Sequence, residues 1–108
     1  VRLKMIENMV DVYYNRGGYS ATLDYLIGAL ERGAFGFYEA LADFYYESGF
    51  QHASRKKEDQ YRILRKYAYT LGEAAGQEAE ILLGEDLAQH FNEEEQKRFY
   101  KKGWEVIQ

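Results

Sequence analysis

The sequence predicts an all-α fold of five or six amphipathic helices packed as antiparallel hairpins, either a helical bundle or a short helical array. The 108 residues contain no proline, the residue that most disrupts a helix interior. Apolar residues recur at spacings of three and four, which gives each helical segment one face to bury. Glycines stand between these segments, as they commonly do where helices end. The length suits a single domain, residues 1–108.

Two helical hairpins are predicted in the first half of the chain, one over residues 3–33 and one from residue 35 on. Gly17 should form the corner of the first hairpin, the segment from Gly33 to Gly36 should separate the second helix from the third, and Gly49 should end the third. The apolar stripes behind these assignments are Leu3, Ile6, Val10 and Tyr13; Leu23, Leu26, Ile27 and Leu30; and Tyr38, Leu41, Ala42 and Tyr45.

Polar residues at helix starts place the remaining elements. Ser20 has the side chain expected of an N-cap for the second helix. Asn92, with Glu95 three positions later, has the spacing of a capping box, which predicts helices over residues 77–91 and 93–107. Whether the region from residue 60 to 91 forms one helix or two stays open, because it contains three glycines, Gly72, Gly76 and Gly84.

Two stretches of the sequence match each other at an offset of 32 residues. MVDVYYNRGGY begins at Met9 and LADFYYESGFQ begins at Leu41, and both carry Asp, Tyr-Tyr and Gly in the same places. In each copy an amphipathic helix ends in Tyr-Tyr, two polar residues and glycine. The match therefore indicates a duplicated structural unit.

This pattern resembles the tetratricopeptide repeat, a helix-turn-helix unit with a period of about 34 residues. Three residues depart from it: Val10 replaces a small residue, Ala34 stands where proline is usual, and Glu58 falls where a large apolar residue should pack. The resemblance implies stacked antiparallel helix pairs over residues 3–49, which two simple helical hairpins would also provide. It is carried by Ile6, Met9, Tyr13, Gly17, Tyr19, Thr22, Leu26 and Ala29 and by Tyr38, Leu41, Ala42, Tyr45 and Gly49.

The net charge of −4 is unevenly distributed along the chain. Residues 55–66 hold 6 basic and 2 acidic side chains, whereas residues 67–95 hold 8 acidic and no basic ones. These charge runs are either solvated helix faces or an acidic segment lying antiparallel to a basic one. Exposed ion pairs of that kind contribute about 0–1 kcal/mol each, so they would set register rather than hold the fold.

The basic segment 55–66 supports an alternative function, a small nucleic-acid-associated regulator. Tyr61 and Tyr67 would then be available to stack on bases. A sequence pI of about 5.2 argues against this alternative, because nucleic-acid-binding domains commonly have a strongly basic balance. The phosphate contacts would be Arg55, Lys56, Lys57, Arg62, Arg65 and Lys66.

The residues that carry catalysis or bind metals are few. The chain has two histidines, His52 and His90, and no cysteine. Asp86 and His90 are four positions apart and would share a helix face, but two ligands do not make a closed metal site, so a surface pair is expected. We therefore expect no catalytic residue, no metal and no cofactor. The absence of cysteine is compatible with a cytoplasmic protein.

Tyrosines form the remaining candidate site. The second tyrosine of each Tyr-Tyr pair should lie about 100° around the helix from a buried first one. Tyr14, Tyr25, Tyr46 and Phe50 are therefore predicted to line a surface that binds a partner, with packing at the edge of the core as the alternative. The sequence thus predicts a non-enzymatic protein–protein interaction or regulatory module, self-associating as a homodimer or another homo-oligomer, with no membrane segment.

Overall fold

Helices form all the regular structure in the part of the chain that the computed structural model describes, residues 2–50 and 56–106. The predicted all-α fold is confirmed for these residues. In chain order the elements are α1 (Arg2–Met9), the π-helical turn η1 that continues it (Val10–Asn15), α2 (Ser20–Leu30), α3 (Gly33–Ser48), α4 (Lys57–Thr70), α5 (Glu73–His90) and α6 (Glu93–Lys102).

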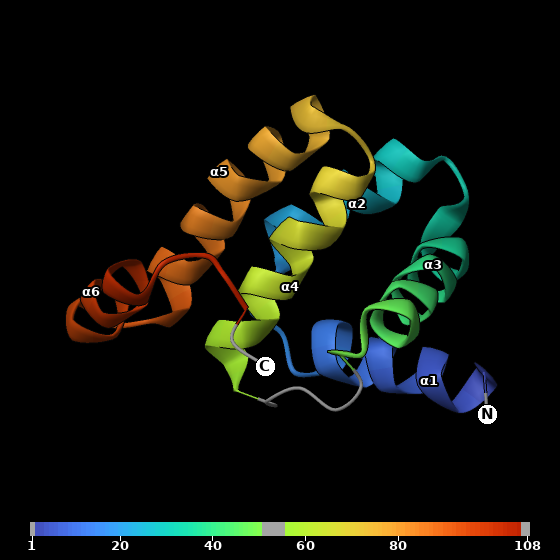
Figure 1. Ribbon diagram of the computed structural model, residues 1–108, viewed down its shortest axis with the longest axis horizontal. Helices are drawn as coiled ribbons and strands as arrows, with labels where there is room; N and C mark the ends of the chain where they lie inside the picture. The colour runs from blue at the N-terminus through green and yellow to red at the C-terminus, as the bar shows by residue number, and fades with distance from the viewer. Residues whose placement is uncertain (1, 51–55, 107–108) are drawn as a thin grey trace.

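Helices α4 and α5 lie side by side at the centre of the molecule (Figure 1). Helix α2 packs against α5 and α3, and α3 packs against α1, so the N-terminal elements cover one side of the central pair. Helix α6 lies at the end of the molecule opposite to α1 (Figure 1). The segment after α6 turns back toward α4, where the Arg62 Nε donates a hydrogen bond of 2.7 Å to the carbonyl oxygen of Gly103.

Glycines mark the ends of several helices, as predicted. Gly17 and Gly49 both have left-handed backbone angles, with φ of +73° and +77°, and each lies just outside a helix. Gly72, with φ of +137°, separates α4 from α5, so the region from residue 60 to 91 contains parts of two helices. Gly76 lies inside α5, where a Cβ atom would collide with the ring of Tyr69. This glycine therefore lets α5 approach α4 closely.

The predicted break between the second and third helices was placed too late. The chain turns at Glu31, which has a left-handed φ of 55°, and α3 already begins at Gly33. Gly36, expected in the break, is buried within α3, where a Cβ atom would stand 2.6 Å from the Cβ of Arg32. Gly36 therefore provides close packing inside the helix, whereas Gly33, with a left-handed φ of +74°, stands at its first position.

Two boundaries in the C-terminal half also differ from the prediction. Helix α5 spans Glu73–His90 instead of residues 77–91, and α6 ends at Lys102 because Gly103 leaves the helix with a φ of +85°. The predicted capping box is confirmed. The Asn92 side chain accepts a bond of 2.8 Å from the Glu95 backbone, and the Glu95 side chain accepts one of 2.9 Å from the Asn92 backbone.

The N-terminus of α2 is capped from a distance, not by Ser20. The structural N-cap position is Tyr19, which makes no side-chain cap bond. Instead, the buried Asp86 carboxylate of α5 accepts bonds from the backbone N–H groups of Ala21 (3.2 Å) and Thr22 (3.0 Å) and from the Thr22 hydroxyl (2.8 Å). A carboxylate at this position also complements the positive end of the helix dipole.

Buried tyrosines connect the N-terminal helices to α4. The hydroxyls of Tyr13 and Tyr45, which occupy equivalent places in the two matching stretches, hydrogen-bond to each other. Tyr13 also donates to the Gln60 carbonyl oxygen at 3.2 Å, and the Tyr19 hydroxyl donates to the Gln60 side chain at 2.7 Å. Tyr61 donates to the Gly18 carbonyl oxygen at 2.6 Å. Because all four hydroxyls are bonded, these large side chains can be buried without leaving polar groups unsatisfied.

Candidate interaction surfaces

The predicted partner-binding residues are divided between the surface and the core. Tyr14 and Tyr46 have 68% and 63% of their area exposed, and Tyr25 is half-buried. Phe50 is only 6% exposed and packs edge-to-face on Phe44 and Tyr45, with ring centroids 5.7 and 6.1 Å apart. The assignment of Phe50 to an exposed surface is therefore corrected, because it fills the core immediately after Gly49.

Tyr14 and Tyr46 point outward because their neighbours are anchored in the core. Tyr13 is fully buried and Tyr45 is 7% exposed, and the bond between their hydroxyls joins η1 to α3. The next residue on each helix then faces solvent, as the helical rotation predicts. We call Tyr14 and Tyr46 the tyrosine surface. Burial strongly raises the pKa of Tyr13, with further contributions from Tyr45 and Tyr19, so its hydroxyl stays protonated to a higher pH than that of an exposed tyrosine.

The basic segment does not present the phosphate contacts predicted for it. Arg62 is 3% exposed, and its guanidinium also binds Asp59 at 2.7 Å and stacks on Phe99. Lys57 donates to the Gly17 carbonyl oxygen at 2.8 Å; burial, together with the charge of Arg16, lowers its pKa. Arg62 is therefore buried in the fold, and the partly buried Lys57 ties the start of α4 to the turn at Gly17.

The other members of that segment are placed differently. Arg65 pairs with Glu80 at 3.5 Å, which confirms that the acidic α5 lies against the basic α4. Lys56 and Lys66 are exposed, and Arg55 lies outside the described residues. The two predicted stacking rings, Tyr61 and Tyr67, are 0% and 4% exposed, so neither can serve as a platform for bases. Among the described residues of the predicted set, Lys56 and Lys66 are the ones that are exposed.

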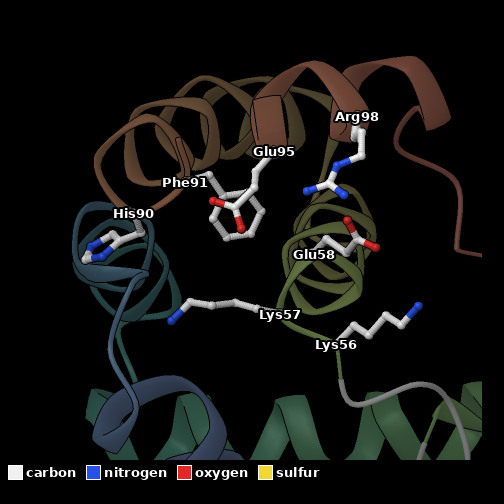
Figure 2. A pocket seen from close by; sticks show the side chains of 7 residues that line it. All are labelled: Lys56, Lys57, Glu58, His90, Phe91, Glu95 and Arg98. Atoms are coloured by element: carbon white, nitrogen blue, oxygen red, sulfur yellow. The ribbon is translucent and has the colours of Figure 1, made fainter. Parts of the chain in front are cut away.

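A depression of about 400 Å³ lies where the start of α4 meets the end of α5 and the face of α6 (Figure 2). Arg98 of α6 and Glu58 of α4 reach into the same space (Figure 2). Opposite charges alternate around the depression, so it does not concentrate the potential of one sign. Its lining residues are Lys56, Lys57, Glu58, His90, Phe91, Glu95 and Arg98.

The residues considered as metal ligands are not brought together. Asp86 is buried and capping α2, whereas His90 is exposed at the end of α5. The expected Asp86–His90 surface pair is therefore wrong, because the Asp86 carboxylate is buried against the start of α2. His52 lies outside the described residues. Within residues 2–50 and 56–106, no group of three or more His, Cys, Asp or Glu side chains could hold a metal ion.

The sequence did not single out an exposed apolar face on α5 and α6. Ile81 is 60% exposed and Tyr100 is 50% exposed, on either side of a groove of about 450 Å³. Ile81 lies outside the apolar stripe of its helix, so its exposure could have been recognised from the sequence. On α6, Phe99 is fully buried, whereas the next residue, Tyr100, is half-exposed. The groove is lined by Gln77, Glu80, Ile81, Gly84, Tyr100 and Trp104.

None of the helices in the described ranges is both long enough and apolar enough to cross a membrane. The family model that matches this chain carries the description "Protein of unknown function (DUF4080)", and the match covers residues 1–107. No curated protein and no solved structure matches the chain. Evidence on function therefore comes from the surfaces described above.

Proposed function

This chain belongs to the DUF4080 family, and we propose that it is a non-enzymatic protein-interaction module that self-associates and contacts a protein partner through its tyrosine surface. The observation that carries the proposal is the exposure of Tyr14 and Tyr46, 68% and 63%, beside a hydrogen-bonded buried pair. Tyrosine is enriched where proteins meet, because it buries a large area at a low cost in side-chain entropy.

The support from the core makes these two side chains suitable anchors. Tyr13 and Tyr45 fix the backbone from which Tyr14 and Tyr46 project, so little backbone ordering is needed on binding. Single exposed apolar residues need no explanation, but two aromatic rings at equivalent places of a duplicated motif indicate a common use. The chain itself offers a binding surface, so a regulatory role would depend on which protein binds there.

A photo-crosslinking side chain in place of Tyr14 or Tyr46 tests the proposal in the cells that normally produce the protein. We expect a discrete crosslinked species from either position, whose mass identifies the partner as a second copy or another protein. The same side chain at the exposed Asp24 of α2 is the control and should give no such species. The absence of a discrete product from Tyr14 and Tyr46 would contradict the proposal.

The alternative, a nucleic-acid-associated regulator, now depends on Lys56 and Lys66. A duplex that shifts the protein in a gel at low salt, and no longer does so after both lysines are changed to Glu, would favour it over the protein-interaction function.

A further inference from the structure

Helices α5 and α6 present a continuous outward face that the fold does not use. Its centre is the groove of about 450 Å³ between Ile81 and Tyr100. The Tyr100 side chain reaches from α6 to α5 here, since a Cβ atom on Gly84 would stand 3.4 Å from the Tyr100 hydroxyl. Trp104, half-buried after α6, closes one side of the groove and packs on Phe99 with a centroid distance of 4.9 Å.

The α5 half of this face is acidic along its outer edge. At about 100° per residue, Ile81 lies at the centre of the exposed side of α5. Glu78 and Glu85, both exposed, follow one edge, and Gln77 and Gly84 follow the other edge, where they line the groove. From the outside toward the groove, α5 therefore presents carboxylates and then an exposed isoleucine.

The α6 half is aromatic next to the groove and basic beyond it. Tyr100 borders both the groove and a second depression, of about 500 Å³. That second depression is also lined by Lys97 and Lys101, both exposed, and by Glu93 at the N-terminal end of the helix. Across the whole face the order is acidic, apolar, groove, aromatic, basic, with Glu80 on the groove wall, where it pairs with Arg65, and Glu93 beside the lysines.

A face with this order is complementary to a second copy of itself. A two-fold rotation about an axis along the groove places α5 of one copy on α6 of the other. Ile81 then meets Tyr100, and the edge of Glu78 and Glu85 meets Lys97 and Lys101; each contact occurs twice, as an isologous interface requires. A rotation that placed α5 on α5 would instead oppose four carboxylates, which the charges disfavour.

We propose that the α5–α6 face is the two-fold interface through which two copies of this chain associate. The proposal rests on the self-association included in the proposed function, but it does not involve the tyrosine surface. Helix α6 is suited to the task because Phe99 is fully buried and the capping box fixes its first turn. The dimer would leave Tyr14 and Tyr46 of both copies for a protein partner.

Charge reversal tests the interface and its symmetry together. One variant carries Glu78→Lys and Glu85→Lys, and the other carries Lys97→Glu and Lys101→Glu. In sedimentation equilibrium we expect wild type to dimerise and each variant alone to dimerise about tenfold or more weakly, since both contacts become repulsive. An equimolar mixture of the two variants should recover dimers, because every α5–α6 contact between them is again between opposite charges.

Glu7→Lys with Glu47→Lys is the matched control, because it makes the same change of charge on the exposed sides of α1 and α3. It should dimerise like wild type, and circular dichroism should show all variants folded. A monomeric wild type, a wild-type dimer that either reversal leaves intact, or a mixture that fails to recover would each overturn the proposal. These variants should keep crosslinking from Tyr46, whereas loss of that crosslinking with an intact dimer would contradict only the tyrosine surface.

Discussion

Single residues decide where α2 begins, and Asp86 is the most important of them. Its carboxylate receives three hydrogen bonds from Ala21 and Thr22 while only 3% exposed. The sequence favoured Ser20, because it is the nearest residue of a type that commonly caps helices. A capping side chain that belongs to another helix leaves no local sequence pattern. Asp86 looked like a surface residue for the same reason: its partners are 64 and 65 positions away.

Replacing Asp86 by Ala should lower the free energy of unfolding by about 2–4 kcal/mol, since it removes a helix cap and leaves buried donors unpaired. Urea denaturation followed by circular dichroism measures the change. Asp86→Asn, which keeps one acceptor oxygen, should lose less. Glu47→Ala, an exposed carboxylate on α3, is the control and should stay within about 0.5 kcal/mol of wild type. An Asp86→Ala protein as stable as wild type would show that the cap contributes nothing.

Between elements, one buried arginine joins α4 to the segment that follows α6. Arg62 binds the Gly103 carbonyl oxygen and Asp59, and its guanidinium carbon lies 4.4 Å from the centroid of the Phe99 ring. From the sequence it read as one member of a basic run, because a charge run gives no sign of which member turns inward. The helices themselves were predictable, since their apolar spacing and glycine punctuation are local. Their pairing and the long-range bonds were not.

Arg62→Met should loosen the end of α6 while preserving the apolar stem of the side chain. We expect the free energy of unfolding to fall by about 2–3 kcal/mol, and the fluorescence of Trp104, the single tryptophan, to shift to longer wavelength as water reaches its ring. The exposed Lys66→Met on the same helix is the matched control and should change neither quantity. Unchanged Trp104 emission in Arg62→Met would contradict this role.

At the scale of the whole molecule, the buried tyrosines make the stability of the fold decrease at alkaline pH. Burial raises the pKa values of Tyr13, Tyr19, Tyr45 and Tyr61 above their ordinary value of 10.0. The folded chain therefore keeps these protons at a pH at which the unfolded chain releases them. The stabilisation is fully present below pH 10 and is lost as the pH rises further.

The free energy of unfolding should consequently fall above pH 10 by about 1.4 kcal/mol per pH unit for each tyrosine that stays protonated in the folded state. Urea titrations at a series of alkaline pH values measure this slope. Tyr13→Phe removes one such group. Its free energy of unfolding, measured relative to the value of the same variant at pH 8, should therefore fall less steeply with pH. A stability that is independent of pH between 9 and 11 would contradict the prediction.

The candidate sites could be predicted from the sequence where they depend on neighbouring residues, but not where they depend on contacts between separate elements. The outward placement of Tyr14 and Tyr46 required only the helical period and a buried neighbour, and it was predicted. Phe50 was misplaced because its burial depends on Phe44 and Tyr45 after a turn. The face of α5 and α6 was missed because it exists only once two separate helices lie together.

The bond from Asp86 to Thr22 also sets an order of events during synthesis. A ribosome that has delivered the chain as far as Gly72 has made all of α2, yet the group that holds its first turn has not been polymerised. The first turn of α2 therefore remains uncapped until α5 has been synthesised. Contacts between residues so distant in sequence form only after the segment between them exists. Pausing translation between these two points would therefore leave α2 free to fray from its beginning.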